Sequence, residues 1–270
     1  MIDLRLGNCQ EVMKGIPDCC IDMVITSPPY DNLRTYEGIS EWNESVWQIT
    51  LAEIFRVLKE GRCCIWIVND ATVKGTETLT SFKQALFAKS IGFNVHDTMI
   101  WYKRAGGHIF CPQRYIPSFE YMFVFTKGKI KTCNLIFDRK NIHYGEVSIC
   151  SNRLPDGTTK PKTHKKIKEF GKRYNVWEIE PVQSNKERTG HPAQFPIEIV
   201  KDHILTWSDK GETILDPFCG SGTTAEACII TGRNFIGCEI NENYYKIALR
   251  RIEKAKRIQD HLLFLDLQNG

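Results

Sequence analysis

Short apolar runs alternate with longer segments of helical periodicity over most of the chain. The runs expected to form strands are Leu4–Leu6, Ile21–Ile25, Cys63–Val68, Val95–Tyr102, Tyr121–Thr126, Thr213–Leu215 and Phe235–Cys238. The segments expected to form helices are Gln10–Lys14, Glu44–Lys59, Ser81–Ser90, Pro196–Trp207, Ala225–Thr231 and Asn243–Arg257. We expect Gly61 to close the second of these helices. The alternation predicts a doubly wound, mostly parallel α/β sheet, with an antiparallel hairpin of 95–102 and 121–126 at one edge.

The composition is that of an ordinary globular protein. Of the 270 residues, 42% are hydrophobic and 25% are charged, which excludes a disordered or collagen-like chain. No apolar run approaches the ~20 residues that a membrane helix needs, and the first residues show no signal peptide. We therefore expect a cytoplasmic protein that does not contact membranes.

The eleven cysteines are scattered, and no two of them are separated by two residues. Zinc sites need closely spaced ligands, so no metal site is expected. A disulfide framework is not expected in a chain of this size without a signal peptide. We interpret the cysteines as reduced, small apolar side chains.

Positive charge is concentrated in one segment, Lys127–Asn175. This segment holds thirteen Lys or Arg and four Asp or Glu, a local charge of +9 in a chain whose net charge is +4. Such a segment on an acidic remainder favours a surface for nucleic acid, and a solvated loop is the alternative. The candidate DNA-binding residues are Lys160, Lys162, Lys165, Lys166, Lys168, Lys172 and Arg173.

A glycine-rich turn, Asp216-Pro217-Phe218-Cys219-Gly220-Ser221-Gly222-Thr223-Thr224, joins an expected strand to an expected helix. Glycines let the backbone approach a ligand, and a helix amino terminus offers free N–H groups to a carboxylate or phosphate. Glu239 follows Gly220 by nineteen residues, at the end of the next strand, where it can accept both hydroxyls of a ribose. The turn lacks the G-x-G-x-x-G fingerprint of dinucleotide sites. A nucleoside that carries an amino-acid carboxylate, S-adenosylmethionine, fits better, and an ordinary tight turn is the alternative.

A rigid turn, Ser27-Pro28-Pro29-Tyr30, ends the expected strand 21–25. Two consecutive prolines cannot continue a central strand, and open α/β sheets place reacting groups at the carboxyl ends of strands. The lone pair of an exocyclic amino group is delocalised into its ring, so acceptors for both N–H protons would localise it on nitrogen. Ser27 Oγ and the Pro28 carbonyl are candidate acceptors, and Tyr30 can stack on a base turned out of the double helix. A simple loop is the alternative.

The segments TSPPY and DPFCGSGTT together resemble the amino-group DNA methyltransferases, which make N4-methylcytosine or N6-methyladenine. Their order, catalytic turn first and cofactor turn last, is similar to that of the permuted β group of this family. The resemblance extends to 7–9, 120–128, 176–177, 191–196 and 232–239. It implies a Rossmann-like fold that uses S-adenosylmethionine. Its parts are a catalytic half over 1–128, an inserted target-recognition region over 129–175, and a cofactor-binding half of the same domain over 176–270.

The resemblance and the two turns together assign roles to single residues. The catalytic residues are expected to be Ser27, Pro28, Pro29 and Tyr30. The cofactor-binding residues are expected to be Asn8, Cys9, Asp216, Phe218, Gly220, Ser221, Gly222, Thr223, Thr224 and Glu239. The resemblance places Asn8 and Cys9 near the cofactor's adenine, and 191–196 are expected beside the pocket. The first position of the catalytic turn is commonly Asp for adenine and Ser for cytosine, so Ser27 favours cytosine N4 and leaves adenine N6 as the alternative.

Two other interpretations compete with a DNA methyltransferase. One is a protein or RNA methyltransferase with a P-P-Y turn, in which the cofactor turn would come first and no basic insertion would be expected. The other is an inactive DNA-binding relative, in which damage would be expected in the cofactor turn or at Glu239, yet both are intact. The expected partner is double-stranded DNA. A cognate restriction endonuclease, a homodimer and the recognition sequence are left open.

Overall fold

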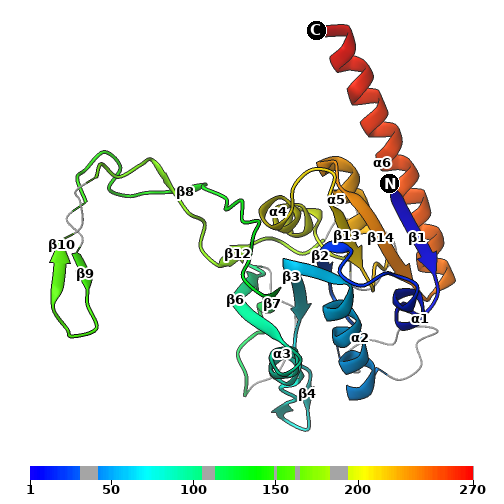
Figure 1. Cartoon of the computed structure of the whole chain (residues 1–270), viewed down its shortest axis with the longest axis horizontal. Coiled ribbons are helices and arrows are strands. Elements are labelled where there is room, and N and C mark those ends of the chain that lie inside the picture. The colour runs from blue at the N-terminus through cyan, green and yellow to red at the C-terminus, as the bar shows by residue number, and fades with distance from the viewer. Residues whose placement is uncertain (31–41, 105–112, 149–150, 162–164, 183–193, 270) are drawn as a thin grey trace. The chain divides into compact units, whose positions relative to one another are not determined.

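An eight-stranded sheet in the order β1-β14-β13-β2-β3-β7-β6-β12 lies at the centre of the larger of two units (Figure 1). The computed structural model describes residues 1–30, 42–104, 113–148, 151–161, 165–182 and 194–269. The larger unit comprises Met1–Asn134 with Asn175–Gly270, and the smaller unit comprises Leu135–Tyr174.

The strands of the sheet are β1 (Ile2–Leu6), β2 (Ile21–Thr26), β3 (Leu58–Val68), β6 (Phe93–Tyr102), β7 (Phe119–Lys127), β12 (Val176–Glu178), β13 (Thr213–Asp216) and β14 (Asn234–Glu239). Neighbouring strands are parallel except at β7, which is antiparallel to β3 and β6. The expected mostly parallel sheet with an antiparallel pair is confirmed. The short strand β12, which the sequence analysis missed, extends the sheet beyond β6. A separate hairpin of β4 (Thr72–Val73) and β5 (Thr76–Glu77) follows β3.

The helices are α1 (Cys9–Lys14), α2 (Glu44–Val57), α3 (Thr80–Ser90), α4 (Ile197–Trp207), α5 (Thr223–Thr231) and α6 (Glu242–Asn269). Buried side chains of α1, α2 and α3 belong to one apolar cluster, and those of α4, α5 and α6 belong to a second. The sheet therefore has helices on both faces. Helix α6 continues well past the expected end at Arg257, because neither glycine nor proline interrupts the chain from there to Asn269.

Strand β3 shows how the apolar runs produce these layers. Cys64 and Trp66 belong to the first cluster, whereas Cys63, Ile65 and Ile67 belong to the second. Successive side chains of a strand point to opposite faces, so a run that is apolar at every position is buried on both. An uninterrupted apolar run of this kind thus indicates a central strand that lies between two layers of helices.

The expected end of the helix that starts at Glu44 is wrong. The helix ends at Val57, and Leu58 already pairs with β2 in an extended conformation. Gly61 lies inside β3 with φ +82°, where a Cβ atom would approach the Lys131 Cδ to 2.5 Å. Glycine is needed here for a left-handed backbone and a close side-chain approach, and it does not end the helix.

The smaller unit consists of short hairpins without a core of its own. Strand β8 (Arg139–Lys140) pairs with β11 (Phe170–Gly171), and β9 (Ser151–Arg153) pairs with β10 (Thr159–Pro161). None of its side chains in the described residues is buried. Backbone hydrogen bonds hold it together, with an ion pair between Arg173 and Asp138.

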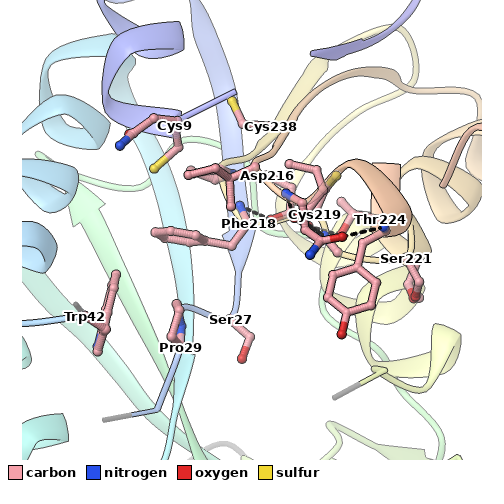
Figure 2. A pocket seen from close by; sticks show the side chains of 18 of the residues that line it. Cys9, Ser27, Pro29, Trp42, Asp216, Phe218, Cys219, Ser221, Thr224 and Cys238 are labelled. Carbon is pink, nitrogen blue, oxygen red and sulfur yellow. Dashed lines mark hydrogen bonds between the residues drawn. The ribbon is translucent and has the colours of Figure 1, made fainter. Parts of the chain in front are cut away.

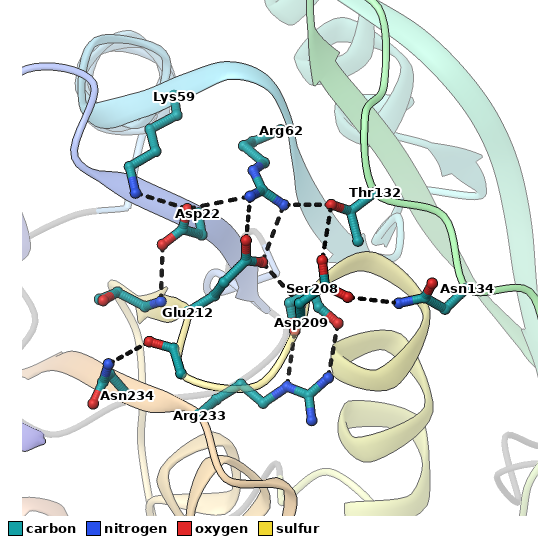
Figure 3. A network of polar contacts seen from close by, with 12 residues as sticks. Asp22, Lys59, Arg62, Thr132, Asn134, Ser208, Asp209, Glu212, Arg233 and Asn234 are labelled. Carbon is teal, nitrogen blue, oxygen red and sulfur yellow. Dashed lines mark hydrogen bonds and ion pairs between the residues drawn. The ribbon is translucent and has the colours of Figure 1, made fainter.

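A polar network connects the amino ends of β2 and β13 with β3 (Figure 3). Asp22 accepts hydrogen bonds from Lys59 Nζ at 2.7 Å and from the Thr213 N–H at 3.0 Å. The Arg62 guanidinium is ion-paired with Glu212, and both side chains are mostly buried. This network fixes the register of central strands at the edge opposite their carboxyl ends.

At the carboxyl ends of β2 and β13 a single buried carboxylate has the same role. Asp216 accepts hydrogen bonds from Thr26 Oγ1 at 2.7 Å, from Thr224 Oγ1 at 2.5 Å and from the Phe218 N–H at 3.1 Å. Burial nevertheless raises the pKa of Asp216 to about 6, although the three donors act in the opposite direction. The carboxylate ties the end of β2 to the start of α5.

This raised pKa predicts a stability that depends on pH. Asp216 has a usual pKa of 3.8 and a pKa of about 6 in the folded chain, so between these values the folded chain holds a proton that the unfolded chain has released. Its contribution to the free energy of unfolding therefore falls as the pH rises from 4 to 6. Asp216→Asn cannot titrate, and the difference between wild type and variant should fall by about 2–3 kcal/mol over this window.

Urea unfolding of both proteins between pH 4 and pH 7 measures this difference. Burial also raises the pKa of Glu239, and the charge of Asp216 adds to that rise, so the difference between the two proteins includes a smaller part from Glu239. Two curves of unfolding free energy against pH that run parallel would contradict the assignment to Asp216.

Candidate active site

The carboxyl ends of β1, β2, β13 and β14 open into one pocket (Figure 2). These four strands are parallel neighbours, so the segments that follow them meet at one edge of the sheet. The expected site residues that line the pocket are Asn8, Cys9, Ser27, Pro29, Tyr30, Asp216, Phe218, Gly220, Ser221, Thr223, Thr224 and Glu239. The pocket thus brings together the two turns that the sequence analysis singled out.

Two expected site residues do not line the pocket. Pro28 is buried and does not line the pocket. Gly222 has φ +82° and faces helix α6, where a Cβ atom would lie 3.0 Å from the Ala248 Cβ. Gly222 therefore permits the close packing of α5 on α6.

The Glu239 carboxylate is held in a fixed orientation by two backbone groups. Its Oε2 accepts from the Gly220 N–H at 2.9 Å, and its Oε1 accepts from the Asn241 N–H at 2.7 Å. The Ile240 N–H also contributes, and because a carboxylate has about four acceptor sites, acceptor capacity remains for a ligand. Burial raises the pKa of Glu239, and these N–H groups favour its charged form. Two fixed acceptors beside a pocket fit the two hydroxyls of a ribose.

The start of α5 offers backbone N–H groups to the same pocket, which Thr223 and Thr224 line. Its N-cap, Gly222, has no side chain to accept from the first N–H groups of the helix. The Arg251 guanidinium donates to Thr223 Oγ1 at 2.8 Å and forms an ion pair with Glu226. The free N–H groups of a helix amino terminus fit a carboxylate, whereas Arg251 is paired with Glu226 and does not line the pocket. Arg251 lies on α6 and was missed, because a basic residue on a charged helix carries no recognisable signal.

The catalytic turn is joined to the sheet by a chain of hydrogen bonds. Ser27 Oγ donates to Tyr30 Oη at 2.9 Å, and Tyr30 Oη donates to Glu120 Oε2 at 2.6 Å. The Glu120 carboxylate is buried on β7 and forms an ion pair with Lys103. Glu120 belongs to a segment that the resemblance included, but the sequence analysis assigned it no role.

Other residues of the pocket were also missed. Trp42 packs edge-on against Phe218 with 5.5 Å between ring centroids, and Figure 2 shows both side chains at the pocket. Asn241 lines it from the turn after β14, and Tyr244 lines it from the first turn of α6; the position after a strand end was the available signal. Of the expected segment 191–196, residues 191–193 lie outside the described residues, and Gln194 and Phe195 line the pocket.

The expected DNA-binding residues lie in the smaller unit. The exposed ones are Lys160, Lys165, Lys166, Lys168 and Lys172. Arg173 is partly buried by its ion pair with Asp138, and Lys162 lies outside the described residues.

Two further features concern the part of the chain that the structure describes. It contains no group of three His, Cys, Asp or Glu side chains that could hold a metal ion. None of its helices is long and apolar enough to cross a membrane.

Relatives of this chain are DNA methyltransferases. The family model N6_N4_Mtase, described as DNA methylase, matches residues 21–250. The orphan methyltransferase M.BamHII of Bacillus amyloliquefaciens is 46% identical over 250 residues, which cover 89% of this chain and 91% of that protein. The DNA adenine methyltransferase YhdJ of Escherichia coli (strain K12) is 29% identical over 258 residues, which cover 92% and 82%, respectively.

Solved structures share the fold. The PvuII DNA methyltransferase, which is cytosine-N4-specific, aligns with a TM-score of 0.66 at 17% identity and covers 97% of this chain and 92% of its own. Other structures of this fold are complexes with S-adenosylmethionine. Because the family model spans most of the chain and M.BamHII matches it almost end to end, the chain belongs to the N6 and N4 DNA methylase family and is a DNA methyltransferase of that family.

Proposed function

We propose that the chain transfers the methyl group of S-adenosylmethionine to the exocyclic amino group of a flipped base in DNA, with cytosine N4 as the target. The observation that carries the proposal is that the catalytic turn and the glycine-rich turn open into one pocket. A methyl donor and an acceptor base must meet in line, and two turns in one pocket allow this.

The residues around the glycine-rich turn would hold the cofactor. Glu239 would accept the ribose hydroxyls, and the start of α5 would receive the methionine carboxylate. Asn8 and Cys9 would lie near the adenine, and Phe218 would form an apolar wall. When bound, S-adenosylmethionine supplies an electrophilic methyl group on a positively charged sulfur.

The catalytic turn would prepare the amino nitrogen. Ser27 Oγ would accept one amino proton, and the Pro28 carbonyl, although Pro28 does not line the pocket in this structure, would accept the other; together they localise the lone pair on nitrogen. Tyr30 would lie against one face of the flipped base. Alignment would carry much of the catalysis, because the turn itself holds no strong base.

Ser27 is the residue that favours cytosine. In the family that the sequence resembles, Ser at this position is common for cytosine and Asp for adenine. The relative YhdJ, an adenine methyltransferase, supports the adenine alternative. We assign cytosine because Ser27 contacts the reacting group directly in the proposed complex.

The smaller unit would recognise DNA, as part of the inserted region 129–175 between the catalytic half 1–128 and the cofactor-binding half 176–270. Its lysines among the described residues are exposed, and because none of its described side chains is buried, it has little internal packing to keep a fixed shape. Phosphate contacts would supply both affinity and order. DNA as the substrate fits the expected cytoplasmic location. A cognate endonuclease and a homodimer are further expectations from the sequence.

Nucleoside analysis of DNA tests the proposed function. Genomic DNA from a methylase-deficient host should gain N4-methylcytosine when the chain is expressed, and the same host carrying Ser27→Ala should gain much less, because an acceptor for the amino proton is removed. Mass spectrometry of digested DNA measures both modified bases. N6-methyladenine without N4-methylcytosine would refute the cytosine assignment. If neither modified base were found, the proposed function would be refuted.

Salt dependence tests the role of the smaller unit. Changing Lys165, Lys166 and Lys168 together to Gln should weaken DNA binding and flatten its slope against log salt, by about 0.9 for each phosphate that is no longer neutralised. The same changes at the exposed Lys246, Lys254 and Lys256 of α6 serve as the control. Fluorescence anisotropy at salt concentrations from low to well above physiological measures the slopes. Equal slopes for wild type and the first variant would make this stretch a solvated loop.

A further inference from the structure

The buried Glu120 and the partly buried Lys103 form an ion pair behind the catalytic turn, and neither lines the pocket. Glu120 is 5% exposed, and its two oxygens face different partners, Tyr30 Oη at 2.6 Å and Lys103 Nζ. Lys103 also lies 4.2 Å from the centroid of the Trp101 ring. An ion pair that served only to join β6 and β7 would not need to contact the catalytic turn.

Counting hydrogen-bond donors fixes the direction of each hydrogen bond that connects Ser27, Tyr30, Glu120 and Lys103. An ammonium group only donates, and an ionised carboxylate only accepts. Tyr30 has one hydroxyl proton, and the 2.6 Å hydrogen bond to Glu120 uses it. The Ser27 hydroxyl proton is then donated to Tyr30 Oη, at 2.9 Å. Ser27 Oγ therefore has only lone pairs left for a group in the pocket.

We propose that Glu120, held by Lys103, is a positioning residue that makes Ser27 an obligate hydrogen-bond acceptor. This inference rests on the proposed function, and it specifies the chemistry that the catalytic turn selects. A substrate atom next to Ser27 must carry a proton, as an exocyclic amino group does. A ring nitrogen or a carbonyl oxygen would face lone pairs and be rejected.

Glu120→Gln tests the direction of these hydrogen bonds. Lys103 can bond only to the amide oxygen, so the amide NH₂ turns towards Tyr30. Tyr30 then donates to Ser27, and the Ser27 proton points at the amino group. We expect kcat to fall about 100-fold, while KM for S-adenosylmethionine and for DNA stays within about threefold, because the acceptor acts mainly in the transition state.

A second change should reverse the first. In the double variant Lys103→Met with Glu120→Gln, no ammonium claims the amide oxygen, which is free to accept from Tyr30 again. We expect most of the kcat to return, although the carboxylate charge is still absent. A double variant as slow as Glu120→Gln alone would overturn the proposal, because the charge and not the direction would then matter.

Tyr30→Phe separates this role from a structural one. The ring remains, but the link between Ser27 and Glu120 is cut, and kcat should fall about 10-fold, the size of one hydrogen bond. Adding Glu120→Gln to Tyr30→Phe should then change kcat by less than about threefold. If Glu120 only stabilised the fold, its substitution would cost as much in the Tyr30→Phe variant as in the wild type, and that result would overturn the proposal.

Methyl transfer from labelled S-adenosylmethionine to genomic DNA of a methylase-deficient host is the assay for all variants. Glu212→Gln is the matched control, because it alters an ion-paired glutamate far along the sheet and should leave kcat unchanged. A wild type that methylates no amino group would refute the proposed function itself. An active wild type with an equally active Glu120→Gln would refute only this inference. Should Glu120→Gln fail to fold, an unchanged kcat in Tyr30→Phe would still overturn it.

Discussion

The hydrogen bond between Thr26 Oγ1 and Asp216 Oδ1 joins two residues that are 190 positions apart in the chain. Thr26 is the last residue of β2 and precedes the catalytic turn, and Asp216 is the last residue of β13 and begins the glycine-rich turn. The same carboxylate also accepts from Thr224 at the start of α5. One buried group thus sets the separation of the two turns, and its raised pKa reflects the desolvation that this position requires.

Fixed hydrogen-bond direction is the second constraint on the site. Backbone N–H groups orient the Glu239 carboxylate, and the buried Glu120 orients Tyr30 and Ser27. In both places hydrogen bonds fix the orientation of an acidic side chain, one at the pocket and one behind the catalytic turn. The smaller unit differs in kind, because none of its described side chains is buried and its surface is rich in lysine. In the proposed function, the larger unit would provide a rigid site and the smaller unit an adaptable surface for DNA.

The sequence was sufficient where function depends on local pattern. Apolar runs predicted the central strands, and the two turns predicted the residues that meet in the pocket. The prediction from the sequence failed where contacts between distant segments determine a residue's conformation or role. Gly61 is required by the left-handed backbone that β3 adopts there, and Glu120 acquires its contact with Tyr30 only when β7 lies beside the catalytic turn. Likewise, the three residues of β12 form a strand only because β6 offers them an edge.

A crystal structure with S-adenosylmethionine bound tests the central claim, that the two turns form one site, most directly. The account predicts ribose hydroxyls within hydrogen-bond distance of both Glu239 oxygens and a sulfonium methyl group directed at the turn Ser27–Tyr30. A cofactor bound with its ribose away from Glu239, or with its methyl group turned away from Ser27, would contradict it.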